Sequence, residues 1–322
     1  MRSAWIHVCG VVALMALSSL PASGADGNAT LHVVSFGAVH GEITDCGCKS
    51  DKKGGFDLRA GVIDSLHNEG VALLHLDAGD FFSTQEFGAD ELSRFLWEAM
   101  KKTEVDAVTP GARELGNWSL FQELMADDVI PVVTTNLTRV QDGVEAPIGQ
   151  RHVVLERAGV KIGILGLISG RQYTSVQFPE GVDVRFYDPL TEARKEILAL
   201  EGQADLIVLL SQMPAADTNA ILKQIPEIDL AILGNLPAYN EAPETVGDAI
   251  VQATGTRGQY LGHLVLTVDP EGKVVGHESK NAKLWDPLPR DLEMAEQIRE
   301  MLEKVKTITI EARAAAAREA GE

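Results

Sequence analysis

The chain has 322 residues, of which 47 are acidic and 28 are basic, so its formal net charge is −19 with histidine neutral. A surface this acidic repels phosphate polymers, which excludes nucleic acid as a partner. The length suits one large domain or two small ones.

The N-terminus has the pattern of a targeting segment. A basic residue at position 2 precedes an apolar run over residues 8–20, and small residues follow at 21–25. This pattern is typical of a secretory signal peptide, and the run is shorter than the ~20 residues that span a bilayer. We therefore expect residues 1–25 to be a signal peptide, with no integral membrane segment after its cleavage. The protein would be exported: periplasmic in a Gram-negative bacterium and secreted in any other host.

Hydrophobic periodicity predicts alternating strands and helices in the first half of the chain. Apolar runs predict strands at residues 31–36, 71–76, 107–108 and 130–134, and helical spacing predicts helices at 59–68 and 90–102. Strands that alternate with helices in this way indicate an α/β fold.

The second half continues the same alternation. The pattern predicts a hairpin at 153–156 and 161–167, helices at 189–200 and 219–224, strands at 206–210 and 230–233, and paired strands at 250–252 and 260–268. Apolar side chains recur every three or four residues over 292–308, which predicts an amphipathic helix, and the alanine-rich tail at 312–322 is expected to fray or to dock elsewhere. We expect one domain at 26–290 and a C-terminal helix and tail at 291–322.

Five predicted strand ends carry the residues of interest, because α/β folds bind ligands in loops beyond the carboxyl ends of strands. They are Gly37-Ala38-Val39-His40-Gly41, Gly79-Asp80, Gly111-Ala112-Arg113-Glu114, Ser211-Gln212-Met213 and Gly234-Asn235-Leu236-Pro237. In order and spacing these blocks resemble the calcineurin-like metallophosphoesterases, most closely the secreted 5'-nucleotidase and UDP-sugar hydrolase family. The resemblance covers roughly residues 31–290. It implies a four-layer α/β/β/α sandwich of two mixed sheets, in which two metal ions hydrolyse phosphoric esters.

Most of the family's metal ligands are replaced in this chain. The family pattern runs Asp-x-His, Gly-Asp, Gly-Asn-His-Glu, a lone His and Gly-His-x-His, and only His40 and Asp80 match its ligands. The other ligand positions hold Ala38, Ala112, Gln212, Asn235 and Pro237. Arg113 stands where the family has the His that stabilises the transition state. The resemblance therefore implies a dismantled two-metal centre, with no cofactor expected beyond one divalent metal ion on the remnant His40 and Asp80.

The sequence leaves three functions open at this site. The first is a divergent family member with lost or much reduced phosphohydrolase activity that keeps a ligand-binding or thiol-redox pocket. The second is a phosphoesterase that uses a single metal on His40 and Asp80. The third is an anion-binding module centred on Arg113, whose guanidinium holds phosphate or carboxylate through two parallel bonds. The candidate ligand-binding residues are Arg113, Glu114, Gln212 and Asn235. The partner would be a small anionic molecule or another protein.

Purely structural roles compete with these functions. His40 is equally explained as a hydrogen-bonded histidine at a strand end, and Asp80 as the ion-pair partner of Arg113. Arg113 in turn is explained as a structural partner of Asp80 or Glu114.

The segment Cys46-Gly47-Cys48 follows His40 closely and is a candidate redox pair. Two thiols around one glycine close a small, strained disulfide ring that is readily reduced, and the neighbouring lysines favour a thiolate. A soft-metal site with His40 and a static disulfide are the alternatives. A similar Cys-Gly-Cys, followed by Gly-Gly and an arginine, occurs in a subset of the secreted phosphoesterases that this chain resembles, and Gly54-Gly55 and Arg59 match that pattern.

The predicted C-terminal helix resembles the helix that links the metal domain of two-domain relatives to a second, nucleotide-binding domain. No such second domain follows in this sequence, so we expect it to be absent. The helix then packs on its own domain or binds a partner protein.

Overall fold

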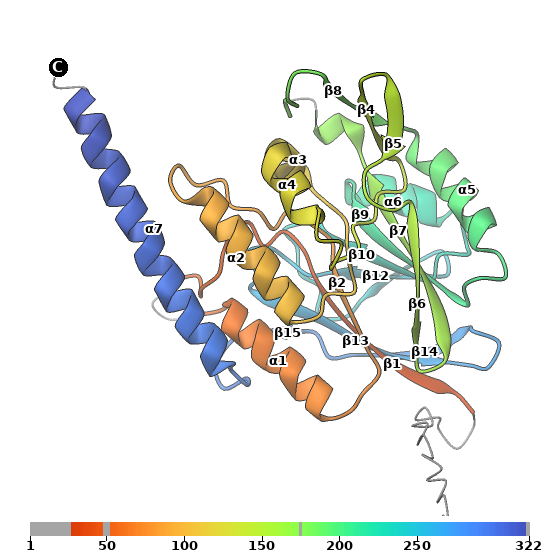
Figure 1. The fold of residues 1–322 in the computed structure, drawn as a ribbon. Helices are drawn as coiled ribbons and strands as arrows, with labels where there is room; N and C mark the ends of the chain where they lie inside the picture. The colour runs from red at the N-terminus through yellow and green to blue at the C-terminus, as the bar shows by residue number, and fades with distance from the viewer. Residues whose placement is uncertain (1–26, 48–51, 174–175, 320–322) are drawn as a thin grey trace, which may run out of the picture.

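A computed structural model describes residues 27–47, 52–173 and 176–319 of the chain. The predicted signal peptide and Cys48 lie outside these ranges. Within them the chain forms a four-layer α/β/β/α sandwich of two mixed sheets (Figure 1), which confirms the predicted fold class.

Each of the two main sheets combines parallel and antiparallel strands. The first sheet has the order β14-β13-β1-β2-β3, with β15 also paired to β13. Its strands are β1 (Ala29–Phe36), β2 (Leu73–Asp77), β3 (Ala107–Val108), β13 (Tyr260–Val268), β14 (Val274–Ser279) and β15 (Ala282–Lys283). The second sheet has the order β11-β12-β10-β9-β7-β6. Its strands are β6 (His152–Arg157), β7 (Val160–Ile168), β9 (Leu206–Gln212), β10 (Leu230–Leu233), β11 (Glu244–Val246) and β12 (Ala249–Ala253).

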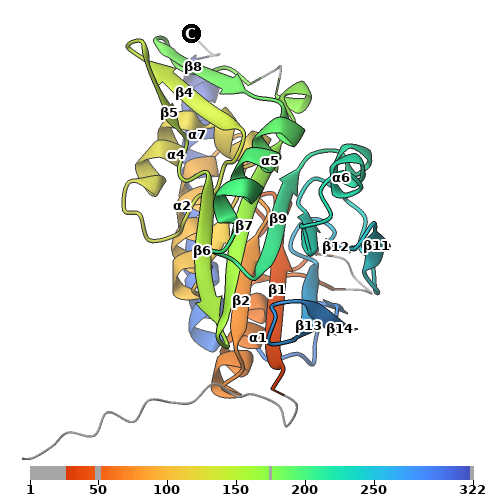
Figure 2. The same cartoon turned by 90° about the vertical axis from the view of Figure 1, so that its right-hand side faces the viewer.

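Helices cover the outer faces of both sheets, and a small third sheet lies at one end of the sandwich. Figures 1 and 2 show α1 (Phe56–Asn68), α2 (Ala89–Lys102) and α7 (Leu292–Glu319) outside the first sheet, and α5 (Pro189–Leu200) and α6 (Ala215–Leu222) outside the second. Two short helices, α3 (Ala112–Gly116) and α4 (Trp118–Met125), follow β3. The third sheet joins β4 (Leu137–Gln141), β5 (Val144–Pro147) and β8 (Val182–Phe186).

The alternation of side chains along β1 builds two layers of the core at once. Leu31 and Val33 point between the two sheets, where they meet Ile162 and Val208 of the second sheet. Val34 points to the opposite face of the sheet and packs under α1. Because successive residues of a strand face opposite sides, one short apolar run supplies both the inter-sheet core and the seat of a helix.

Two sequence predictions about strands are wrong. The segments 250–252 and 260–268 were expected to pair, yet β12 pairs with β10 in the second sheet while β13 pairs with β1 in the first. The segment 130–134 forms no regular strand, because only Val132 and Val133 make isolated bridges, to Val108 and to Gln150. Strand partners distant in sequence are not specified by local pattern, which explains both errors.

The C-terminal helix α7 packs on its own domain through its first turns. Met294 and Ile298 are buried against the core that includes α2. Gly61 in α1 permits the approach, since a Cβ there would lie 2.5 Å from the Pro289 carbonyl oxygen. The helix α7 continues to Glu319 and its last turns extend past α2 (Figure 1), so the expectation that the tail frays or docks elsewhere stays a prediction. No helix in the described ranges combines the length and apolar character needed to cross a membrane.

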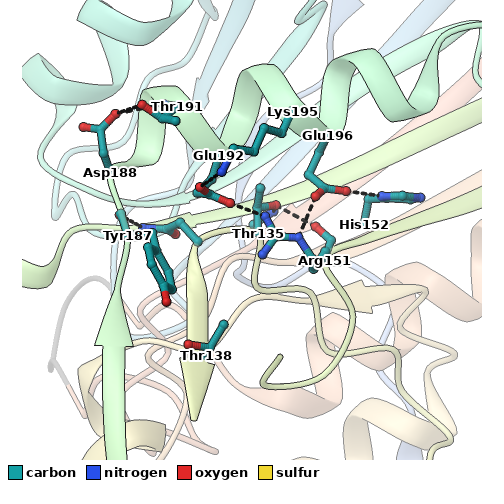
Figure 3. A network of polar contacts seen from close by, with 12 residues as sticks. Thr135, Thr138, Arg151, His152, Tyr187, Asp188, Thr191, Glu192, Lys195 and Glu196 are labelled. Carbon is teal, nitrogen blue, oxygen red and sulfur yellow. Dashed lines mark hydrogen bonds and ion pairs between the residues drawn. The ribbon is translucent and has the colours of Figure 1, made fainter. Parts of the chain in front are cut away.

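A cluster of ion pairs fastens α5 to the edge of the second sheet (Figure 3). Arg151 donates from Nε to Glu196 at 2.6 Å and from Nη2 to Glu192, while His152 Nδ1 lies 2.6 Å from Glu196. Lys195 completes the cluster at 2.6 Å from Glu192. Both glutamates are buried, and a buried carboxylate is tolerated when cations and hydrogen bonds compensate it. The cluster therefore holds α5 against the second sheet.

Asp229, directly before β10, has a partly buried carboxylate whose ionised form is disfavoured by burial. Asp229 accepts a hydrogen bond from the Ile207 N–H at 2.8 Å, yet burial raises the pKa of its side chain to about 6. The folded state therefore holds a proton more tightly than the unfolded chain does. The ionised carboxylate costs stability above pH 6, and this cost disappears as the pH falls towards 4.

We expect Asp229→Asn to raise the free energy of unfolding by about 1 to 3 kcal/mol at pH 8, because the amide keeps the acceptor and removes the buried charge. The gain should shrink towards pH 4.5, as measured by urea unfolding across this range. Asp205, whose exposed side chain accepts the same kind of bond from Lys161 N–H at 2.8 Å, supplies the control Asp205→Asn, which should show no such trend. A constant difference between wild type and Asp229→Asn at every pH would contradict the assignment.

Candidate functional site

The two sheets are in close contact where β1, β2 and β10 end. A Cβ at Gly234 would lie 2.0 Å from the Ala78 carbonyl oxygen, and one at Gly37 would lie 2.9 Å from the Gly234 Cα. Only residues without a side chain fit this contact. The loops that follow these strands are thereby brought onto one surface, as the sequence predicts.

Glu114 joins the loop after β2 to the loop after β3. Its Oε2 accepts hydrogen bonds from the N–H groups of Asp80 at 2.9 Å and Gly111 at 2.7 Å, and its Oε1 accepts from Phe82 N–H at 2.7 Å. The side chain is fully buried, and burial together with the nearby Asp80 raises its pKa to about 7. Glu114 was predicted to bind ligand, but both of its oxygens accept backbone hydrogen bonds and its side chain is fully buried, so the structure gives it a supporting position.

Asp80 is held by the start of α3. Its Oδ1 accepts a hydrogen bond from the Arg113 backbone N–H at 3.0 Å. Gly111 leaves room for the carboxylate, because a Cβ there would lie 2.2 Å from Asp80 Oδ1. Burial raises the pKa of Asp80, and the bond and charge of Arg113 oppose that rise. The predicted ion pair between the side chains of Asp80 and Arg113 is wrong, since the contact runs through the Arg113 main chain.

The side chain of Arg113 points to neutral oxygens. Its Nη1 donates to the Phe82 carbonyl oxygen at 3.2 Å and to Thr84 Oγ1 at 3.0 Å. In the described part of the chain its Nε and Nη2 have no hydrogen-bond partner, and no carboxylate forms an ion pair with it. The positive charge of Arg113 is therefore not neutralised by a direct partner, and one edge of the guanidinium remains unused.

Arg113 lines a polar cavity of about 340 Å³ beside His40. The wall consists of His40, Gly41, Glu42, Ser83, Thr84, Gln85, Arg113 and Arg257. Thr256 Oγ1 lies 3.2 Å from His40 Nδ1. Burial first, and then the charges of Arg113 and Arg257, lower the pKa of His40 to about 4, so its imidazole is neutral at physiological pH.

Sequence reasoning missed two charged residues of this wall. Arg257 donates from Nε and Nη2 to Glu42 Oε1 at 3.1 and 2.8 Å. Its backbone N–H also donates to the Ala38 carbonyl oxygen at 2.7 Å, which fixes the loop after β12 against the loop after β1. The available signal was the position of Arg257 directly before Gly258-Gln259-Tyr260-Leu261-Gly262, a block that agrees with the resembled family.

Gln212 and Asn235, both predicted to bind ligand, do not line this cavity. Gln212 is fully buried at the end of β9, where its Nε2 donates to the Ala78 carbonyl oxygen. Its Oε1 is buried without a hydrogen-bond partner among the described residues. Asn235 follows Gly234 and is partly exposed. Of the predicted site residues, His40 and Arg113 are thus the two that meet on the cavity wall.

Cys46 does not line this cavity. Cys46 N–H donates to the Lys53 carbonyl oxygen at 2.9 Å, and Gly54 N–H donates to that of Leu284 at 2.8 Å. Because Cys48 lies outside the described residues, the redox pair stays a prediction. Arg59, the arginine of the same motif, is buried in α1, where it donates to Asp77 Oδ2 at 3.1 Å.

The residues present do not fit a two-metal centre. Among the described residues, no three His, Cys, Asp or Glu side chains gather in a way that could hold a metal ion. His40 and Asp80, the two predicted remnants, already have partners in Thr256 and in the Arg113 backbone. A pair of metal ions needs more donors than these two side chains supply.

Two facing mixed sheets between helical layers, with the candidate site at the strand ends, define the class of protein: a metallophosphoesterase-like α/β/β/α sandwich. Among solved structures, that of a 5'-nucleotidase precursor from Thermus thermophilus superposes with a TM-score of 0.74 at 19% identity, covering 87% of this chain and 60% of that one. The calcineurin-like phosphoesterase YfkN from Bacillus subtilis gives a TM-score of 0.68 at 17% identity, covering 86% of this chain and 98% of that one. At these identities the likeness concerns the fold.

Sequence comparison points the same way. The uncharacterized metallophosphoesterase YunD of Bacillus subtilis is 27% identical over 61% of this chain and 41% of its own length. A probable 5'-nucleotidase of Treponema pallidum is 24% identical over 69% of this chain and 41% of its own length. No protein-family model matches the chain. The chain resembles metallophosphoesterases and 5'-nucleotidases in sequence and shares their fold, which confirms the predicted family resemblance. The Cys-Gly-Cys subset and the replaced metal ligands stay predictions. The match covers 41% of the length of each of these two sequence relatives.

We expect Glu114→Ala to lower the free energy of unfolding by about 3 kcal/mol or more, because three buried N–H groups lose their acceptor together. Chemical denaturation with circular dichroism measures the change. Glu123 in α4 is an exposed glutamate paired with Arg94, and Glu123→Ala is the matched control that should change stability little. Equal losses in the two variants would show that Glu114 does not hold the loops together.

Proposed function

We propose that the chain is an exported, divergent metallophosphoesterase-like protein with lost or much reduced phosphohydrolase activity, which binds a small anion at Arg113. The observation that carries this proposal is the arrangement of the Arg113 guanidinium. It lines the cavity, is anchored through Nη1 alone, and keeps its Nε–Nη2 edge free of protein partners in the described residues. That edge offers two parallel N–H groups, the geometry that carboxylate and phosphate oxygens accept best.

The rest of the wall suits an anion that is bound and not cleaved. Ser83 and Thr84 line the cavity beside Arg113 and carry hydroxyl groups, and His40 is a neutral imidazole there. The resemblance places Ala38, Ala112 and Pro237 where relatives have metal ligands, and these side chains have no donor atom. A two-metal centre activates a water molecule as the nucleophile, and the replacement of these ligands supports lost or much reduced hydrolysis.

The names of the relatives suggest phosphate chemistry for this cavity. One relative is called a probable 5'-nucleotidase and another a metallophosphoesterase. Phosphate is therefore the first anion to test, even though the chain spans only part of those proteins.

A second candidate function is a phosphoesterase that uses one divalent ion on His40 and Asp80. The observation in its favour is Gln212 Oε1, a buried oxygen without a partner among the described residues. It belongs to an amide that lies next to Gly79, since a Cβ at Gly79 would lie 3.0 Å from Gln212 Nε2. A cation or a water molecule would satisfy this oxygen.

We expect isothermal titration calorimetry to detect binding of inorganic phosphate to the wild-type protein, and Arg113→Ala to weaken it by about tenfold or more, since a charge-assisted bidentate contact is lost. Added salt should weaken the wild-type binding. Arg171, an exposed arginine paired with Asp217, supplies the control Arg171→Ala, which should bind as wild type does. If wild type and Arg113→Ala give equal heats, or neither gives any, the proposed site is refuted.

A further inference from the structure

The wall of the cavity carries two unused charged edges of opposite sign. One is the Nε–Nη2 edge of Arg113. The other is Oε2 of Glu42, because both bonds from Arg257 go to Oε1, at 3.1 and 2.8 Å, and Oε2 has no hydrogen-bond partner in the described part of the chain. The side chain of Glu42 is 34% exposed and lines the cavity.

The charges around the cavity do not favour a polyanion. On the wall itself Arg113 and Arg257 are cationic, and Glu42, which pairs with Arg257, is anionic. Directly behind the wall, Asp80 contacts the Arg113 backbone at 3.0 Å and adds a second carboxylate. A ligand with several negative charges would be attracted by one free guanidinium edge and repelled by Glu42, whereas a ligand with one charge of each sign would meet a partner for both.

We infer that the cavity binds a small zwitterion of the free α-amino acid class. The ligand carboxylate accepts from Nε and Nη2 of Arg113, and its ammonium group donates to Oε2 of Glu42. This assignment rests on the proposed anion-binding function and specifies the class of ligand. The cavity volume of about 340 Å³ is at the small end of the range for ligand sites, and Ser83, Thr84 and Gln85 supply further polar contacts for such a molecule.

Glu42 also has a simpler role, that of a counter-ion for Arg257. The two roles differ in one measurable respect. If Glu42 is only a counter-ion for Arg257, an ammonium group on the ligand does not change the affinity. If Glu42 recognises the ligand, the ammonium group increases the affinity. A pair of ligands that differ in this group alone therefore separates the two roles.

The test compares alanine with propionate, which share the carboxylate and the carbon chain and differ in the ammonium group. Calorimetry with the full chain should show alanine binding about tenfold more tightly than propionate, the effect of one added charge-assisted bond. In Glu42→Gln the two ligands should bind alike, with alanine weakened to the level of propionate. Arg113→Ala should weaken the binding of both ligands.

Glu86, an exposed glutamate near the wall that does not line it, supplies the control Glu86→Gln, which should keep the tenfold preference. Thermal unfolding confirms that each variant is folded.

The outcomes separate this inference from the proposed function. Equal affinity of wild type for alanine and propionate, both dependent on Arg113, would overturn the zwitterion and leave anion binding intact. Binding of phosphate with no response to either organic ligand would do the same. A preference for alanine that survives in Glu42→Gln would remove Glu42 from recognition and overturn the assignment. If neither phosphate nor a carboxylate binds, the proposed function fails and this inference fails with it.

Discussion

The site depends on one buried carboxylate, that of Glu114, which accepts three backbone hydrogen bonds from the loops after β2 and β3. Burying a charge costs free energy unless hydrogen bonds compensate it, and here the donors come from two loops that Arg113 also links through its bonds to Asp80 and Phe82. With Glu114 in place, Asp80 is set against the start of α3 and Arg113 is carried to the cavity wall. Glu114 and Gly111 thus hold the backbone of these loops in place. This role does not depend on which side chains occupy the ligand positions of the resembled family.

Across this end of the sandwich, the residues that position the loops are not the ones that carry functional groups. Gly37 and Gly234 let the two sheets meet, and neither supplies a functional group. The alanine, glutamine and proline that stand at ligand positions of the resembled family do not disturb this contact. The loops are positioned by glycines, by main-chain hydrogen bonds and by Glu114. A fold shared with metal-dependent phosphoesterases is therefore compatible with a cavity in which a guanidinium supplies the positive charge.

The sequence predicted the parts of the structure that local pattern controls. The alternation in β1 and the apolar spacing in α2 identified these elements within a residue or two, because each buries one face against the core. The partner of β13 and the pairing of Glu42 with Arg257 could not be predicted, since these contacts join segments about two hundred residues apart. The sequence block after Arg257 indicated only that this loop belongs to the site. His40 and Arg113 were placed at the site from their positions after strands. The direction of the Arg113 side chain depends on Phe82 and Thr84, which no pattern singles out.

The central claim is that Arg113 provides the positive charge that two metal ions provide in related enzymes, and metal binding tests it most directly. The full chain would be equilibrated with manganese or zinc, desalted, and analysed for bound metal alongside turnover of an aryl phosphate. A two-metal centre requires about two metal ions per chain. We predict that the chain binds fewer than this and shows no metal-dependent turnover. About two bound ions per chain together with metal-dependent hydrolysis would contradict the claim.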